Sequence, residues 1–136
     1  MPTWAKVLLS IFAILIALFA VCGFIAYRWV TKNKDQIVAS RNEGIEFGKG
    51  KDFVQCTDAA LARLGNGMTA QIQARMFADG CYSSATKSEE LCAGIPPRTE
   101  IMKNAQWNAE QCRKRGVASQ EACVQVMQAL GEGCRR

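Results

Sequence analysis

The sequence predicts an all-α protein with a single N-terminal transmembrane helix, a helical stalk, and a small disulfide-stapled bundle of about four to five short helices. A long apolar run lies near the start of the 136-residue chain. Six of the seven cysteines follow it, among apolar residues at helical spacing and glycine or proline stops. The predicted parts are a short N-terminal tail at 1–6, a transmembrane helix at 7–27, a charged stalk or linker at 28–51, and a cysteine-rich helical extracytoplasmic domain at 52–136.

The apolar run from Val7 to Tyr27 has the length of a membrane span. It contains no charged residue, and as a helix it would be about 31 Å long, which matches the hydrocarbon core of a bilayer. Trp4 precedes the run and Trp29 follows it, where aromatic side chains favour the membrane interface. The run is therefore predicted to be an uncleaved signal anchor in a cell membrane.

Two other interpretations of this run remain open. Cleavage by a signal peptidase would remove it, but the run is longer than an ordinary signal sequence and no Ala-x-Ala site closes it. Lipoprotein processing before Cys22 is the second interpretation, although Val21 is bulky where a small residue is expected. If neither processing occurs, Cys22 is a small apolar residue that faces lipid or a neighbouring helix.

The orientation of the span presents a conflict. Basic residues are more numerous after the run than before it, which favours a cytoplasmic C-terminus. Cysteines confined to a short domain favour an oxidising compartment, either periplasmic or extracellular. The cysteines are the stronger indication, because so regular a set arises less easily by chance than a small surplus of charge. The basic residues are Lys6 before the run and Arg28, Lys32, Lys34 and Arg41 after it.

The charged segment 28–51 is predicted to continue the membrane helix as a stalk. It contains no proline, and Ile37, Ile45 and Gly48 recur at helical spacing. Gly44 and Gly48 form a Gly-x-x-x-Gly pattern, but they lie outside the apolar span, so we do not expect a membrane dimerisation motif. Gly48 and Gly50 are expected to mark the end of the stalk.

Two helices are predicted at the start of the folded domain. Asp52 and Gln55 form a capping box for the first, and the Gly65-Asn66-Gly67 sequence ends it. Thr69 is expected to cap the second helix, which ends at about Asp79 because Gly80 follows. The expected core residues of the two helices are Phe53, Cys56, Ala60, Leu64, Ile72, Met76 and Phe77.

Three further helices complete the predicted bundle. Ser88 caps a short one, with Glu89 and Glu90 in its first turn, and Pro96-Pro97 ends it. The next runs from about residue 98 to 115, and the last begins after Ser119. The expected core residues are Ile101, Ala105 and Cys112 in the fourth helix, and Cys123, Val126, Met127, Leu130 and Cys134 in the fifth.

The spacing of two cysteine pairs repeats along the chain. In each copy a Cys is followed by six residues, Ser, one residue, Glu, one residue and Cys, which is typical of a helix end, a corner and a new helix start. Cysteines equally far from such a corner lie level with each other. We therefore expect the disulfides Cys81–Cys92 and Cys112–Cys123, which leaves Cys56 to pair with Cys134.

Composition argues against several kinds of chemistry. The chain has no histidine, so a Ser-His or Cys-His catalytic pair is excluded, and the cysteines lack the closer spacing of zinc or iron–sulfur sites. Its net charge of +5 is modest and interspersed, which does not indicate nucleic acid as a partner. No catalytic residue, cofactor or metal site is predicted, and the chain is expected not to be an enzyme.

The function expected from these features is that of a membrane-anchored accessory, assembly or adaptor protein. Its expected partners are the lipid bilayer and another membrane or envelope protein. Trp107, Tyr82 and Arg98 are the candidates for a partner surface, because they are expected to be exposed and tryptophan is favoured at such surfaces. Trp107 could instead fill a second core face. The alternatives are a small ligand-binding or inhibitory module and a thiol-disulfide oxidoreductase.

Overall fold

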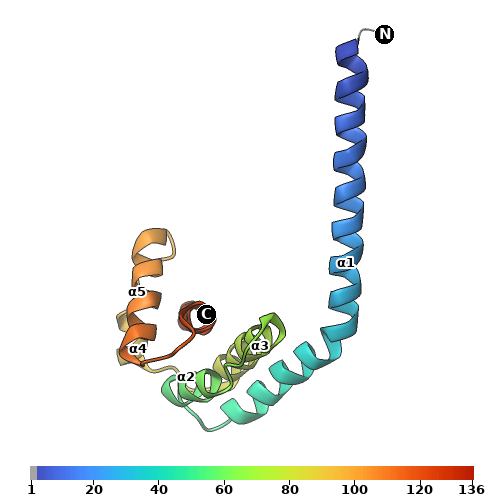
Figure 1. The fold of residues 1–136 in the computed structure, drawn as a ribbon. Helices are drawn as coiled ribbons and strands as arrows, with labels where there is room; N and C mark the ends of the chain where they lie inside the picture. The colour runs from blue at the N-terminus through green and yellow to red at the C-terminus, as the bar shows by residue number, and fades with distance from the viewer. Residues whose placement is uncertain (1–2) are drawn as a thin grey trace. The chain divides into compact units, whose positions relative to one another are not determined.

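The structure is a computed structural model that describes residues 3–136, apart from the side chains of Thr3 and Lys6. Over this range the regular structure is entirely α-helical, as predicted (Figure 1). The structure divides into two compact units, Met1–Lys34 and Asp35–Arg136. The helices are α1 (Thr3–Gly48), α2 (Phe53–Ala62), α3 (Met68–Ser84), α4 (Glu89–Ala93), α5 (Ile101–Lys114) and α6 (Gln120–Arg135).

The first unit consists of the apolar part of α1. Every side chain from Val7 to Tyr27 is exposed, and the helix is long and apolar enough to cross a membrane. Residues 3–6 of the predicted N-terminal tail belong to this helix, whereas residues 1–2 and the Lys6 side chain lie outside the described part of the chain. The structure thus contains one candidate membrane helix within the range that it describes.

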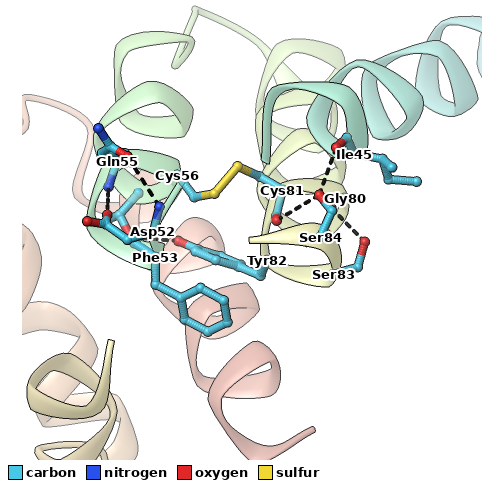
Figure 2. The surroundings of a disulfide bond; sticks show 11 residues. Ile45, Asp52, Phe53, Gln55, Cys56, Gly80, Cys81, Tyr82, Ser83 and Ser84 are labelled. Carbon is cyan, nitrogen blue, oxygen red and sulfur yellow. Dashed lines mark hydrogen bonds between the residues drawn. A yellow bond between two sulfur atoms is a disulfide. The ribbon is translucent and has the colours of Figure 1, made fainter. Parts of the chain in front are cut away.

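The second unit begins inside α1, well before the predicted boundary at residue 52. The stalk is helical to Gly48, as expected, but its residues from Asp35 onward pack within the folded unit. Gly44 and Gly48 are buried against α3, and Ser84 of α3 donates a hydrogen bond to the Ile45 carbonyl oxygen at 2.7 Å (Figure 2). The last turns of α1 are therefore part of the folded unit rather than a free stalk.

Glycines on both helices allow the backbones of α1 and α3 to approach closely. A Cβ atom on Gly44 would lie 2.9 Å from the carbonyl carbon of Phe77, and one on Gly80 would lie 3.1 Å from the amide nitrogen of Ile45. Real Cβ atoms essentially never lie within 3.0 Å of another atom, and a distance of 3.1 Å is tighter than nine in ten real Cβ contacts. The atoms concerned belong to the backbone, so they cannot rotate away. The Gly-x-x-x-Gly pattern thus serves a contact within the chain, outside the apolar run.

Gly80 does not end α3, contrary to the prediction from sequence. The helix continues to Ser84, and it starts at Met68 with Gly67 at the cap position rather than Thr69. Gly80 can remain in the middle of the helix because its missing side chain makes room for the Arg41 backbone. A glycine that ends a helix and one that admits a neighbouring backbone have the same local sequence signature.

The core of the second unit lies between α2, α3 and α6. The capping box at the start of α2 is formed as predicted, with the backbone N–H of Gln55 donating to the Asp52 carboxylate at 2.8 Å (Figure 2). On α3 only Phe77 of the three expected core residues is fully buried. The predicted core residues from the α2 and α6 segments are buried, except that Leu64 and Cys134 are only partly buried against the core. The fully buried residues are Phe53, Cys56, Ala60, Cys123, Val126, Met127 and Leu130.

Three disulfides use all six cysteines of the second unit, but only one joins the predicted partners. Cys112–Cys123 is formed as expected, whereas the other two bonds are Cys56–Cys81 and Cys92–Cys134. The predictions of Cys81–Cys92 and Cys56–Cys134 are therefore wrong. Cys81 lies within the long α3 and faces α2 (Figure 2), so it is not at a corner that would bring it level with Cys92.

Helix α4 depends on the Cys92–Cys134 bond for its attachment. It has five residues, begins after the Ser88 cap as predicted, and buries none of them fully. We predict that the double variant Cys92→Ala/Cys134→Ala loses amide-exchange protection over residues 87–100 by at least about tenfold, because so short a helix is unstable alone.

The matched control is the double variant Cys56→Ala/Cys81→Ala, which removes a different bond. It should reduce protection in α2 and α3 instead, because that bond joins those two helices. Amide hydrogen exchange followed by mass spectrometry measures both effects. Unchanged protection over residues 87–100 in the first variant would contradict this view of α4.

Candidate functional site

The three residues predicted to form a partner surface do not come together in the structure. Tyr82 is only 4% exposed, so its prediction as a surface residue is wrong. Its ring packs against the ring of Phe53 (Figure 2), with the two centroids 4.9 Å apart, and Gly133 of α6 leaves room for its Cβ. Tyr82 is a core residue of the α2–α3–α6 packing.

The buried hydroxyl of Tyr82 has a defined role. The Thr57 hydroxyl donates to the Phe53 carbonyl oxygen at 2.7 Å, and it lies 2.8 Å from the Tyr82 hydroxyl. Since Thr57 has one hydroxyl hydrogen, Tyr82 is the donor in their bond. Burial raises the pKa of Tyr82 far above its ordinary value, so the phenol stays neutral and keeps the hydrogen that it donates to Thr57.

Trp107 and Arg98 lie in different surroundings. Trp107 is half-buried, packs against the core, and lines a hollow with Leu91 and Gln111. It therefore fills a core edge, the alternative role considered for it from sequence. Arg98 is exposed and borders a groove between the 95–108 segment and α6.

This groove, called here the α5–α6 groove, has a volume of about 250 Å³. One wall is the face of α5 that carries Ile101, Ala105 and Asn108, and the opposite wall includes Met127 and Gly131 of α6. The prediction that Ile101 and Ala105 are buried with Cys112 is wrong. The helices are joined at Cys112, but the same face of α5 is uncovered at its start, where Ile101 is 76% exposed.

Asn108 is the polar residue at the floor of the groove. It is 7% exposed, and its side-chain amide has no hydrogen-bond partner among the described residues. Every fully enclosed side-chain polar atom in this part of the chain has a partner, so the Asn108 amide opens onto the groove. The amide therefore meets solvent in the groove, where it is free to exchange hydrogen bonds with water for hydrogen bonds with a ligand.

Arg135 is held in place at one end of the groove. Its Nη2 atom donates to the Asn104 Oδ1 atom at 2.7 Å and to the Pro96 carbonyl oxygen at 3.1 Å. Gly131, one turn earlier, has no side chain, which lets the guanidinium lie close to α6; an added Cβ would be 3.3 Å from Nη1. Neither partner of Arg135 carries a negative charge.

The same end of the groove has an excess of positive charge. Arg98, Arg135 and Arg136 line an adjoining hollow with Asp79 and Glu132. Both carboxylates are already paired. Asp79 pairs with Arg41 and with Arg136 of the same hollow, and Glu132, which also lines the α5–α6 groove, pairs with Arg75 at 3.5 Å. Arg98 and Arg135 have no carboxylate partner among the described residues, so their charge is available to a ligand.

Asp79 of α3 links three parts of the unit, since it pairs with Arg41 of α1 and with Arg136 at the C-terminus. Partial burial acts to raise the pKa of Asp79, but the hydrogen bonds and charges of Arg136 and Arg41 outweigh it and lower the pKa. Because the pKa is lower in the folded state, this stabilisation is complete above the unfolded pKa of about 4 and is lost as pH falls below it.

We predict that Asp79→Asn lowers the free energy of unfolding by about 1 kcal/mol at neutral pH, the scale of partly exposed ion pairs. The difference from the unmodified chain should shrink as pH falls from about 5 to 3. Urea unfolding at several pH values measures it. The control is Asp35→Asn, since Asp35 is exposed and has no ion pair among the described residues. A difference that is independent of pH would contradict the assignment.

The chemistry of the groove is that of recognition. It offers an apolar wall, one unpartnered amide and two arginine side chains that could bind a carboxylate or phosphate. No group of three or more His, Cys, Asp or Glu side chains within the described range could hold a metal ion. Asn108 and Arg135 were not among the residues predicted from sequence, although Asn108 falls seven residues after Ile101, on the same apolar face of α5.

Comparison of the chain with models of known protein families, with curated proteins and with solved structures found no match.

Proposed function

We propose that this chain is a membrane-anchored, non-enzymatic accessory or adaptor protein that presents a disulfide-stabilised helical domain outside the cytoplasm. The apolar half of α1 supports the anchor, because its length and composition suit a bilayer. Three disulfides support an oxidising compartment. Residues 28–34 of α1 join the apolar run to the second unit, so a short stretch of chain links the proposed anchor to the domain.

The observation that carries the adaptor proposal is the exposure of apolar side chains at the start of α5. Ile101 and Met102 are 76% and 73% exposed, and Ile101 lines the α5–α6 groove. Adjacent large apolar side chains beside a groove and two unpaired arginines are typical of surfaces that bind other proteins. This surface is the proposed site of partner binding.

Photo-crosslinking in native membranes tests this proposal. A photoreactive phenylalanine analogue at Met102 is expected to give a discrete adduct with one membrane or envelope protein. The control places the same analogue at Met68, which is 68% exposed at the start of α3 and does not line the groove. Failure to form an adduct at position 102, or equal adducts at both positions, would contradict the proposal.

A small ligand-binding module is the second candidate function, and the unpartnered Asn108 amide is the feature that favours it. The α5–α6 groove is below the range of about 300–1,000 Å³ that is typical of small-molecule sites, and it is open to solvent. A monomer that retains a bound small molecule after purification in mild detergent would support this candidate over the adaptor.

A further inference from the structure

We propose that the α5–α6 groove binds the C-terminal residue of a partner polypeptide. The terminal carboxylate binds Arg98 and Arg135, the last peptide group pairs with Asn108, and an apolar last side chain lies against Ile101. This inference rests on the proposed adaptor function and names the part of the partner that is recognised.

Charge complementarity supports a carboxylate at one end of the groove. Arg98 makes no hydrogen bond or ion pair among the described residues, and Arg135 uses Nη2 on two uncharged oxygens. Glu132 also lines the groove but is paired with Arg75, and Asp79 of the adjoining hollow is paired with Arg41 and Arg136. Arg98 therefore has its whole guanidinium free to bind a planar carboxylate with two parallel hydrogen bonds, and Arg135 contributes its charge and its remaining Nη1 and Nε hydrogens.

Asn108 favours a peptide over a lipid. A side-chain amide has donors and an acceptor, and a peptide group offers the complementary acceptor and donor, so the two can pair. An acyl chain would cover Asn108 and leave its amide without a partner, at a cost in binding. The floor of the groove therefore suits a polypeptide better than a fatty acid or a phospholipid.

The small size of the groove favours a chain end. A volume of about 250 Å³ holds little more than one residue. A single C-terminal residue carries a carboxylate, an adjacent peptide group and a side chain, which are the three groups that the arginines, Asn108 and Ile101 complement. An acidic residue within a chain would need a second residue to supply the apolar contact.

Fluorescence anisotropy with the full chain in uncharged phosphatidylcholine nanodiscs tests the proposal. The probes are fluorescein-labelled peptides Gly-Ser-Ala-Gly-X, with X as Leu, Ile, Val or Phe, each with a free terminal carboxylate or a terminal amide. At least one free acid is expected to bind, and amidation should weaken its binding by at least about tenfold, since hydrogen bonds to charged groups have that effect or more. Arg98→Ala should weaken it similarly.

The control for charge is Lys103→Ala, because Lys103 is an exposed cation of α5 that pairs with Glu100 at 2.9 Å and does not line the groove. Its effect on binding should be within about twofold. Asn108→Leu separates binding from folding. It should weaken binding by about tenfold and leave the melting temperature unchanged or raised, because the Asn108 amide makes no hydrogen bond to the described residues that the substitution could remove.

Several results would overturn the proposal. They are no binding by any peptide up to about 1 mM, equal binding of the acid and the amide, or saturable binding of laurate without binding of peptides. A partner that still crosslinks at position 102 in the Arg98→Ala protein would leave the adaptor function intact and remove only the carboxylate site. Peptide binding without any crosslinked membrane protein would support the carboxylate site and contradict the adaptor function.

Discussion

Reduction of the three disulfides is expected to unfold residues 35–136 at room temperature. The bonds close loops with sequence separations of 25, 42 and 11 residues. In the chain-entropy description, these contribute about 3 to 4 kcal/mol each, and together about 10 kcal/mol. That sum is comparable to the whole net stability of a typical domain, which is about 5–15 kcal/mol. A small core alone is therefore insufficient.

The pattern of the bonds strengthens this expectation. Cys56–Cys81 joins α2 to α3, while Cys92–Cys134 and Cys112–Cys123 join α4 and α5 to α6. Within each set the disulfides connect the helices, whereas α2 and α3 contact α6 through side-chain packing and through the polar contacts of Arg75 and Asp79. Without the bonds, α4 and α5 have few buried side chains to hold them.

Far-UV circular dichroism of the full chain in detergent, with and without tris(carboxyethyl)phosphine, measures the effect. The helical signal of the apolar run should persist, because a helix in an apolar environment keeps its backbone hydrogen bonds. The Cys22→Ser variant should behave like the unmodified chain, since Cys22 forms no disulfide. Equal urea midpoints with and without the reductant would disprove the dependence.

Gly80→Ala is expected to lower the free energy of unfolding by about 3 kcal/mol, the upper part of the range for overpacked sites. In an ordinary helix the same change is favourable by about 1 kcal/mol, so the sign is reversed here. The added Cβ would overlap the Arg41 carbonyl oxygen and lie 3.0 Å from its carbon, and these backbone atoms cannot rotate away. Gly44→Ala should have a similar effect, through the Phe77 backbone.

Gly94→Ala is the matched control for these variants. The Cβ atom added at Gly94 would lie 3.8 Å from the Trp107 Nε1 atom, which is an ordinary contact, and the φ of −80° at Gly94 suits alanine. Its stability should change by less than about 0.5 kcal/mol. If urea unfolding gave equal stabilities for Gly80→Ala and Gly94→Ala, the close approach of α1 and α3 would not be a feature of the folded protein.

The sequence was sufficient for those parts of the fold that local patterns determine. The capping box at Asp52, the Ser88 cap, and the core face of α6 all follow from spacing within one turn or one helix. The Cys112–Cys123 bond was also predictable, because its two cysteines flank one corner between adjacent helices. Each of these features depends on residues close together in the chain.

Features that depend on distant residues were not predictable in the same way. Gly80 resembled a helix stop, and its role became clear only with the Arg41 backbone beside it. Cys92 was expected to pair across the nearest corner, but its partner is on the last helix. For the candidate site, Arg98 was identified from exposure alone, whereas Asn108 became notable because α6 does not supply a hydrogen-bond partner for it.

Cysteine labelling in intact cells or spheroplasts tests most directly whether an oxidised domain is displayed outside the cytoplasm. A membrane-impermeant maleimide is applied with and without prior treatment by a membrane-impermeant reductant, and the modified cysteines are located by mass spectrometry. We predict that Cys56, Cys81, Cys92, Cys112, Cys123 and Cys134 are modified only after the reductant. Modification of these six without reductant, or only after lysis of the cells, would contradict the oxidised state or the location of the domain.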